Sequence, residues 1–337
     1  MQVRDATLPS ATNAMHRACP GWLLLIAAAT AVMTLASGFA GTASSDSGAQ
    51  TGAFANLEPG GRGTGLAGAL GPIVDSPTAL HWNPVRLLHV TRPEIEVTYA
   101  DLFGLGLVRH TGVFLACPRY SQDISWKDGK ITVAPGAPTS AWGLGIQSTM
   151  VDLDPESYTE HDLALGFAAR GRWGLSIGVV GHLLLVRSDV DQTEADGYAF
   201  DLALSSSMAA DLEASLVLRS IFSGLNWEDS DRETLAQRAH MGLGYAPFAT
   251  VRLPLEAIWD LERGRCTQVA GAVEWFPASQ ALTLRGGLRW RDDGSESQLF
   301  PATGLGLAWK QIAFNYGFTV GREELGDTHR LDLRYRF

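Results

Sequence analysis

Charged residues are scarce in this sequence of 337 amino acids: they make up 18% of it, whereas an average soluble domain is about 25% charged. The formal net charge is −10, so the chain lacks the basic surface that binding to nucleic acid requires. Three cysteines are too few for a disulfide scaffold, and no C-x-x-C pair suggests zinc. What remains is an apolar, glycine-rich composition, with 46% hydrophobic residues and 37 glycines, which excludes a disordered chain.

Long hydrophobic runs are also missing, except for one near the N-terminus. Residues 22–35 (WLLLIAAATAVMTL) are predominantly apolar, Arg17 precedes them, and small residues follow at 36, 37, 38 and 40. This order predicts a secretory signal peptide in residues 1–40, cleaved after Gly38 or Ala40. The alternative is a single membrane-spanning helix, which needs about 20 apolar residues. It is disfavoured because no Lys or Arg closely follows the run. We expect an exported protein.

From about Pro93 onward the sequence alternates between apolar and polar residues with period two. In the last eight residues, for example, apolar side chains at 331, 333, 335 and 337 alternate with charged ones at 330, 332, 334 and 336. Most such segments are 8–12 residues long, and a tilted strand needs about 9–11 to cross a membrane. We count fourteen segments, an even number as in bacterial outer-membrane barrels: 93–100, 107–117, 140–150, 160–169, 172–186, 197–206, 209–221, 238–246, 252–261, 266–275, 281–291, 302–309, 312–320 and 328–337.

The connections between these segments are asymmetric. If Phe337 is periplasmic, the connections predicted on its side are short, at 170–171, 207–208, 277–280 and 310–311. Those on the opposite side are long and polar, at 187–196, 222–237 and 292–301. Short periplasmic turns and long outer loops are typical of membrane barrels. Residues 118–139 do not fit, and we expect either a wrong register there or a small protruding hairpin.

A soluble β-sandwich also has strands with one apolar and one polar face, and is the alternative to a barrel. Aromatic residues near the strand ends favour the barrel, because they fit interfacial girdles; they are Tyr99, Trp142, Trp173, Trp259, Trp275, Trp290, Trp309 and Tyr335. We therefore predict an all-β fold, a 14-stranded antiparallel transmembrane β-barrel in residues 93–337, located in the outer membrane.

Residues 41–92 differ in kind, because six glycines crowd positions 60–71. A phosphate-binding loop is disfavoured, since no G-x-x-x-x-G-K-[ST] motif occurs and no strand precedes the run. Glycine also lets a backbone approach a crowded surface closely. We therefore predict that residues 41–92 form an N-terminal plug inside the barrel.

The run GGRGTGLAGALGPIVDSPTALHWNP (60–84) resembles the N-terminal signature of the PorV/PorQ group, which is related to FadL-type outer-membrane barrels. The matching positions are Asp75, Ala79, Leu80, Trp82, Asn83 and Pro84. The segments DLALGFAARGRWGLSIGV, FNYGF and LGDTHRLDLRYRF are similar to the family as well. Val85–Arg86 departs from it, since the family has a small pair there. The resemblance spans roughly 55–337 and implies a fourteen-stranded barrel with its N-terminal segment folded into or under it.

Two functions follow from this resemblance. FadL-type barrels pass long-chain fatty acids or other hydrophobic molecules through a plugged lumen, which implies a hydrophobic small-molecule ligand. PorV-type members serve type IX secretion, which implies exported cargo or a translocon as the partner. Both imply contact with outer-membrane lipids. We expect passage of hydrophobic molecules, with the secretion role as the alternative.

Three sets of residues are candidates for the site. We expect Arg62, Asp75, His81, Trp82 and Asn83 to anchor the plug to the wall or to form a structural corner. A second set either lines an apolar binding pocket or packs the plug: Leu66, Leu70, Ile73, Val74 and Leu80. A third set meets across the seam if the first strand pairs with the last: Glu94 and Glu96 with Arg330, Arg334 and Arg336. Opposite charges facing across a strand pair contribute about 0.2–1 kcal/mol each, and they either neutralise one another or line a conduit.

Chemistry-bearing motifs are sparse. The histidines are scattered over different segments and no H-E-x-x-H motif occurs, so we expect no catalytic residue, metal or cofactor. A Ser-His pair assembled on adjacent strands remains the enzymatic alternative. Cys117 and Cys266 fall on strands placed far apart, so we expect no disulfide between them.

Overall fold

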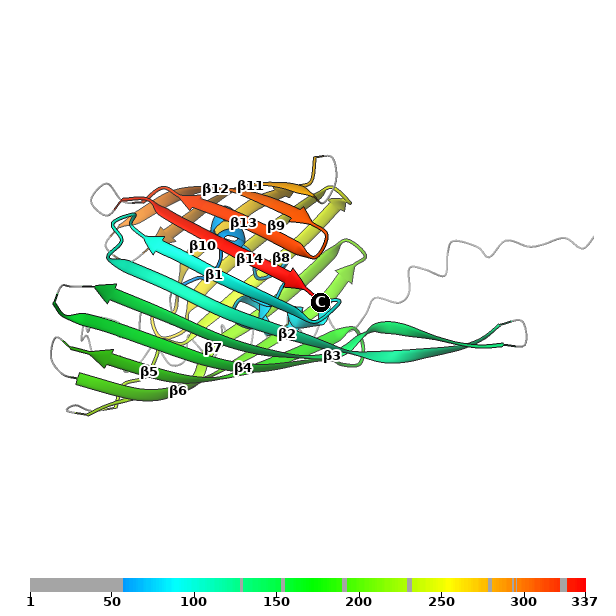
Figure 1. Ribbon diagram of the computed structural model, residues 1–337, viewed down its shortest axis with the longest axis horizontal. Helices are drawn as coiled ribbons and strands as arrows, with labels where there is room; N and C mark the ends of the chain where they lie inside the picture. The colour runs from blue at the N-terminus through cyan, green and yellow to red at the C-terminus, as the bar shows by residue number, and fades with distance from the viewer. Residues whose placement is uncertain are drawn as a thin grey trace, which may run out of the picture.

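The computed structural model describes residues 57–337, with gaps at 128–129, 153–154, 190–192, 229–231, 278–280, 293, 295 and 322–325. The predicted signal peptide therefore lies outside the described residues. Fourteen strands pair antiparallel, each with its neighbours in sequence, and β1 pairs with β14 to close the ring. The predicted fourteen-stranded barrel is thus confirmed (Figure 1).

The strands lie close to the segments predicted from the alternation. They are β1 (Glu94–Leu102), β2 (Val108–Lys127), β3 (Lys130–Asp152), β4 (Ser157–Arg170), β5 (Leu175–Ser188), β6 (Thr193–Ala209), β7 (Leu212–Trp227), β8 (Arg238–Phe248), β9 (Val251–Asp260), β10 (Arg265–Trp275), β11 (Leu282–Asp292), β12 (Ser297–Trp309), β13 (Ile312–Thr319) and β14 (Thr328–Arg336). We call the end that carries Phe337 the inner end and the opposite one the outer end.

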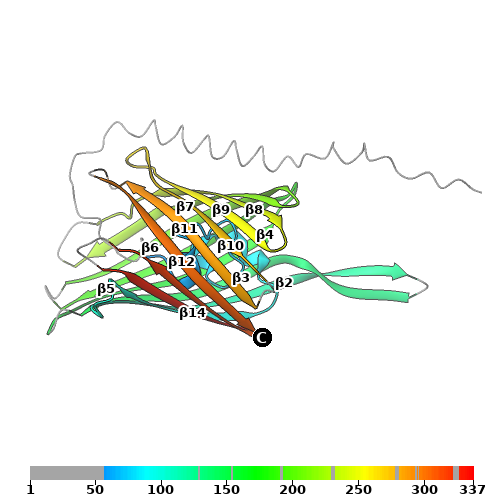
Figure 2. The ribbon, with the colours of Figure 1, turned by 90° about the horizontal axis from the view of Figure 1, so that it is seen from above.

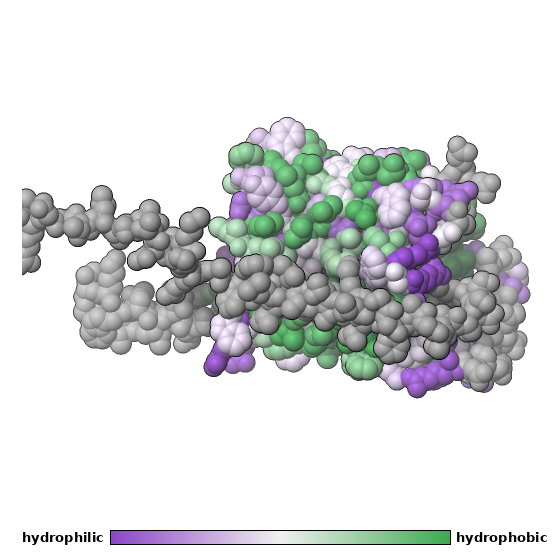
Figure 3. All heavy atoms as spheres, turned by 180° about the vertical axis from the view of Figure 1, so that it is seen from behind, coloured by the Kyte–Doolittle hydropathy of each residue, from purple (hydrophilic) through white to green (hydrophobic). Residues whose placement is uncertain are grey.

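The polarity of the wall is inverted relative to a soluble barrel. On β1, Glu94 and Glu96 point into the lumen and are buried, whereas Val97 and Tyr99 are exposed on the outside. The same alternation leaves large apolar side chains exposed around the barrel, and they cover much of the face shown in Figure 3. Because a closed ring leaves no strand edge unpaired, such a wall satisfies its backbone hydrogen bonds even in an apolar medium. This inversion excludes the soluble sandwich.

Several strands are longer than predicted, which shortens the outer connections. Strand β5 runs to Ser188 and β6 begins at Thr193, so residues 189–192 replace the expected loop 187–196. Polar residues extend this ladder: Arg187 pairs with Glu194 across the strands, with Nε and Oε2 3.1 Å apart. At the inner end, the turn between β6 and β7 lies at residues 210–211 rather than 207–208.

Strands β2 and β3 continue past the barrel as a long hairpin. They contain 20 and 23 residues and remain paired from Val108↔Val151 to Lys127↔Lys130, with register shifts around Tyr120. The hairpin projects beyond the inner end, on the side of the C-terminus (Figures 1 and 2). Of the two expectations for residues 118–139, the protruding hairpin is the one found.

Residues 57–92, the described part of the chain before β1, lie inside the ring of strands, as two short helices and a 3-10 helix (Figure 2). These are α2 (Gly61–Gly65), α3 (Ala79–Trp82) and η3 (Pro84–His89). We call residues 57–92 the luminal segment. Its apolar side chains, Leu66, Leu80 and Leu87 among them, form one buried cluster with wall residues such as Phe114 and Val180. Among the described residues, no helix is both long and apolar enough to cross a membrane.

Glycines on both partners allow helix α2 to touch the wall backbone. A Cβ at Gly61 would lie 2.6 Å from the carbonyl oxygen of Arg330, and a Cβ at Gly65 would lie 2.9 Å from Cα of Gly304. On the wall, a Cβ at Gly317 would overlap the carbonyl oxygen of Gly61. Close approach of two backbones is therefore the reason for glycine at these positions.

We expect Gly317→Ala to loosen the luminal segment, because its Cβ would collide with backbone atoms that cannot rotate away. Overpacking of this kind costs about 1–3 kcal/mol in the free energy of unfolding. Thermal unfolding in detergent and protease cleavage within residues 57–92 would both report it. Gly286→Ala is the matched control, because nothing lies within 4 Å of its Cβ position. Equal effects of the two variants would contradict the close-approach argument.

Candidate functional site

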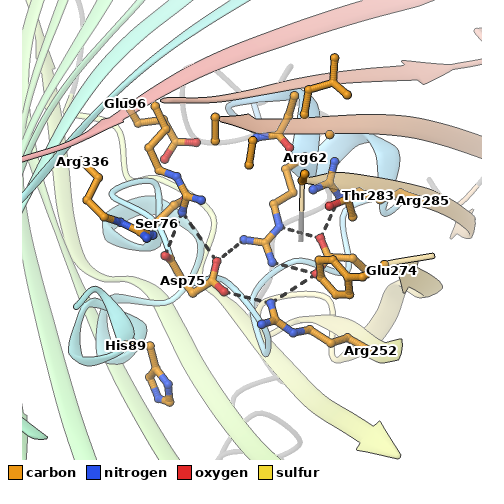
Figure 4. A pocket seen from close by; sticks show the side chains of 18 of the residues that line it. Arg62, Asp75, Ser76, His89, Glu96, Arg252, Glu274, Thr283, Arg285 and Arg336 are labelled. Carbon is orange, nitrogen blue, oxygen red and sulfur yellow. Dashed lines mark hydrogen bonds and ion pairs between the residues drawn. The ribbon is translucent and has the colours of Figure 1, made fainter. Parts of the chain in front are cut away.

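Arg62 of helix α2 is the centre of a buried charge network in the lumen. Its Nε and Nη2 donate to the two carboxylate oxygens of Glu274 on β10, each at 2.9 Å, and its Nη1 donates to Asp75 at 2.5 Å (Figure 4). Its backbone N–H donates to Asp332 on β14 at 3.0 Å. The bidentate arginine–carboxylate pair is among the stronger and more directional hydrogen-bonded contacts in proteins. Arg62 therefore fastens the luminal segment to two distant parts of the wall.

Two wall arginines complete the network. Arg252 on β9 lies 2.9 Å from Asp75 and 3.4 Å from Glu274, and Arg285 on β11 lies 2.8 Å from Glu274. Burial by itself raises the pKa of Asp75, but Arg62, Arg252 and Arg334 outweigh it and hold that pKa well below its usual range. Burying a charge is costly unless it is paired, and here Asp75 and Glu274 each have at least two guanidinium partners. The charges of these two carboxylates are therefore compensated within the lumen.

The barrel seam carries a second set of ion pairs. Glu94 faces Arg336 in the β1–β14 register, with 2.6 Å between the carboxylate and Nε, and Arg334 Nη1 lies 3.6 Å from the same carboxylate. Glu96 instead accepts a hydrogen bond from the backbone N–H of Thr78 at 3.1 Å. Arg330 lies nearer the outer end, opposite Ala100, and interacts electrostatically with Glu58 of the luminal segment. The five seam residues are therefore divided between wall contacts and contacts to the segment.

A cavity of about 480 Å³ opens between the luminal segment and the turns of the inner end. We call it the inner cavity. Its walls carry the Arg62 network and, closer to the inner end, Lys310 and Arg336. Six cationic side chains, Arg62, Arg252, Arg285, Lys310, Arg334 and Arg336, face three carboxylates, those of Asp75, Glu96 and Glu274. The inner cavity is thus polar and basic in a protein of net negative charge.

A second cavity, of about 110 Å³, lies on the other side of the luminal segment, toward the outer end. We call it the outer cavity. His81 and Trp82 of helix α3 form its floor, and its sides combine polar groups with Leu184, Leu235 and Ile258. In contrast to the inner cavity, the outer cavity is partly apolar.

Polar side chains of the wall form hydrogen bonds with helix α3 beside the outer cavity. Arg219 of β7 donates to the backbone carbonyls of His81 and Trp82, while its Nη1 lies 2.6 Å from Asp201. His182 bridges Asp162 and Asp201, at 2.9 and 3.4 Å. Burial and the Arg219 guanidinium lower the pKa of His81 well below its usual range, so this histidine is neutral at pH 7.

The structure distributes the residues singled out from the sequence over three places. Arg62 and Asp75 lie at the inner cavity, and His81 and Trp82 at the outer one. Asn83 is fully buried; it caps η3 by accepting from Val85 N and donates to the carbonyl of Gly71. The apolar set lines neither described cavity and forms part of the packed core: Leu66, Leu70, Ile73, Val74 and Leu80.

Sequence reasoning missed the wall residues that hold the segment. Glu274, Arg252 and Arg285 sit at inward positions of their strands, and so do Asp201 and Arg219. The alternation alone could have marked them as luminal. The pairing of Glu274 with Arg62, 212 positions away, and of Arg252 with Asp75, 177 positions away, could not be read from it, because these pairs depend on where the luminal segment lies.

One short sequence and the two described cysteines bear on the enzymatic alternative. Residues 174–178 (GLSIG) match the letters of the G-x-S-x-G nucleophile motif. That motif needs a sharp turn from strand to helix, whereas residues 175–178 lie within the straight run of β5. No group of three or more potential metal ligands occurs among the described residues, and Cys117 and Cys266 are both free.

No protein-family model and no characterised protein sequence matches this chain. Solved structures do match in fold. CymD, a monoaromatic hydrocarbon channel, has a TM-score of 0.58 at 9% identity, covering 83% of this chain and 98% of CymD. A Pseudomonas aeruginosa FadL homologue has 0.56 at 11% (83% and 99%), and the Ralstonia pickettii toluene transporter TbuX has 0.52 at 11% (84% and 99%). At these identities the likeness shows that the chain shares the fourteen-stranded barrel fold of these proteins.

We expect Arg62→Met to free the luminal segment from the wall, because it leaves the buried Glu274 and the partly exposed Asp75 with fewer partners. Removing one member of a buried pair typically costs about 3–5 kcal/mol. The rate of protease cleavage within residues 57–92 would measure the loss. Arg187→Met removes an exposed ion pair and should change that rate little, since such pairs are worth about 0–1 kcal/mol. Similar cleavage of the two variants would contradict the anchoring role.

The depressed pKa of Asp75 makes the attachment depend on pH. A carboxylate of this kind stabilises the fold above its unfolded pKa, about 3.9, and loses this effect as the pH falls through its folded pKa. We therefore expect wild type to be clearly more stable than Asp75→Asn at pH 7, and the difference to shrink below pH 3. Thermal unfolding followed by circular dichroism at both pH values would measure it. A difference that does not change with pH would contradict this account.

Proposed function

We propose that this protein is an outer-membrane barrel that binds small hydrophobic molecules and passes them passively through its lumen, with residues 41–92 acting as a plug. The observation that carries the proposal is the division of the lumen. The luminal segment separates a partly apolar outer cavity from a polar inner cavity, within a wall that is apolar on the outside. Such an arrangement suits a gated passage.

The location in the outer membrane rests on three features. The expected signal peptide in residues 1–40 would direct export, with cleavage near Gly38 or Ala40. The exposed outside of the barrel is rich in large apolar side chains. An even number of antiparallel strands puts the start of β1 and the end of β14 on one side of the membrane, which in outer-membrane barrels is the periplasm. We therefore assign the inner end and the β2–β3 hairpin to the periplasm.

The class of molecule follows from the outer cavity and from the structural neighbours. Two of these neighbours are named for monoaromatic hydrocarbons and for toluene. In this chain Leu184, Ala199, Leu235 and Ile258 supply the apolar surface that such molecules require. For a molecule to reach the inner cavity, the luminal segment must shift, and the Arg62 network opposes that shift. The plug would therefore open only transiently.

A second function is a PorV-like accessory role in protein secretion, in which the barrel binds exported cargo or a translocon. One observation favours it: the β2–β3 hairpin reaches well beyond the inner end, where a periplasmic partner could contact it. The two cavities favour passage of small molecules, which is why we place this role second.

The test is ligand binding by the mature protein folded in detergent. We expect solvent extraction and mass spectrometry to find a bound apolar molecule, and toluene to bind in calorimetry. Ala199→Trp should abolish binding by filling the outer cavity, whereas Val179→Trp on the outer surface should not. A protein that carries no apolar molecule, binds no toluene and retains a specific exported protein would overturn the proposal in favour of secretion.

A further inference from the structure

The arginines that line the inner cavity are more accessible than the carboxylates that hold them. The side chains of Arg252, Arg334 and Arg336 are 31%, 19% and 39% exposed. Their partners Glu94 and Glu274 are 0% exposed. A solute that enters the cavity would therefore meet the arginine side chains and could not reach these two carboxylates.

The inner cavity continues toward the inner end of the barrel. A second space of about 430 Å³, which we call the inner mouth, shares Thr91, Lys310 and Arg336 with it. The other described residues that line the mouth are Arg92 and Gln311, so no carboxylate is among them. The inner cavity is thus entered between cations.

Two of the cations at the mouth are unpaired. Lys310 and Arg92 are both exposed, and in the described part of the chain neither has an ion-pair partner. The Nζ atom of Lys310 lies 4.6 Å from the centroid of the Trp309 ring. Both side chains are therefore available to an anion that approaches from the inner end.

Positive charge remains in excess when all the charged residues of the two spaces are considered. Their described cations are Arg62, Arg92, Arg252, Arg285, Lys310, Arg334 and Arg336. Against these seven stand the lining carboxylates Asp75, Glu96 and Glu274, and also Glu94 and Asp332, which contact lining residues. Two positive charges are left over.

His89 also lines the inner cavity but does not change this balance at pH 7. Burial and the nearby Arg86 lower the pKa of His89 to about 3, so the imidazole is neutral. The one lining carboxylate with an appreciably exposed side chain is Asp75, at 29%, and it is already held by Arg62 and Arg252. An added anion would therefore face little competition from the chain itself.

The chemistry of these cations selects the kind of anion. The planar guanidinium group matches the oxygen atoms of a phosphate in a two-pronged contact. A phosphate monoester carries a charge of about −1.5 to −2 at pH 7, which is close to the excess of two positive charges. The cavity volume of about 480 Å³ lies in the usual range of ligand pockets, ~300–1,000 Å³, and leaves room for a small polar group attached to the phosphate.

We propose that the inner cavity binds a multivalent oxyanion without an apolar tail, either free phosphate or a phosphate monoester, which enters through the inner mouth. Lys310 and Arg92 attract the anion at the entrance, and Arg252, Arg334 and Arg336 contact it inside (Figure 4). This inference does not rest on the proposed function, because the site lies on the other side of the luminal segment from the outer cavity.

The test measures anion binding to the full mature chain in an uncharged detergent, by calorimetry at pH 7.5 and constant ionic strength. The probes are inorganic phosphate, glycerol phosphate, acetate and octanoate. We expect at least one of the two phosphate probes to bind about tenfold or more tightly than acetate and octanoate. Tighter binding of glycerol phosphate than of phosphate would identify a monoester as the ligand, and the reverse would identify free phosphate.

Two variants remove the unpaired cations, and a third is a matched control. Lys310→Gln and Arg92→Gln should each weaken phosphate binding about twofold to fivefold, as expected for an exposed charge contact, and about tenfold together. Neither change breaks an ion pair of the described structure, so we expect both variants to fold. Arg172→Gln removes an exposed cation between β4 and β5 that lines neither space, and it should leave binding unchanged.

Several outcomes would overturn the inference. One is that neither phosphate probe binds, and another is that acetate binds as tightly as both, since the attraction would then not depend on the valence of the anion. Octanoate binding at least as tight as phosphate would show that the cavity takes the acidic end of an apolar molecule instead. An equal loss in Arg172→Gln and Lys310→Gln would show an effect of overall charge. Toluene binding, which tests the proposed function, is independent of all four results.

Discussion

Charges buried in the lumen must be paired, and this constraint ties the N-terminal part of the chain to the barrel. Glu274 has no access to water, and three arginines from three different elements converge on it. One of them, Arg62, belongs to the luminal segment, so the segment cannot leave without exposing a buried carboxylate to an incomplete set of partners. For Asp75 the roles are exchanged: the carboxylate belongs to the luminal segment, and the arginines beside it, Arg252 and Arg334, belong to the wall.

The same constraint would keep the proposed passage closed. Toward the inner end, the luminal segment is held by the Arg62 network, and along α2 its glycines pack against glycines of the wall. Toward the outer end, Trp82 of the segment borders the outer cavity. A molecule entering the proposed passage from outside would therefore meet the polar and apolar side chains of the outer cavity before it reached the Arg62 network. Water admitted to the inner cavity would weaken those ion pairs, because charge pairs lose strength as the dielectric constant rises.

Much of the architecture could be predicted from the alternation of residues. The fourteen strands and their inward and outward faces follow from it, because a side-chain period of two leaves little choice in a wall with lipid-like surroundings on one side. The loops were less predictable. Polar residues such as Arg187 and Glu194 are typical of a loop, but here they pair with each other and lengthen strands β5 and β6. The protruding hairpin of β2 and β3 likewise depends on the pairing of these two strands, which the alternation of apolar and polar residues does not specify.

The sequence by itself determined the strand count, the polarity of each face and the presence of a glycine-rich segment, since these are properties of local pattern. Arg62 and Asp75 could be marked as anchors in advance. Only the tertiary structure decided their partners, because Glu274 and Arg252 are brought to them by barrel closure and by the path of the segment. The tertiary structure also decided that the leucines of the segment pack in the core, whereas Trp82 borders a cavity. Which apolar side chain is packed against the wall depends on its position in three dimensions, not on its residue type.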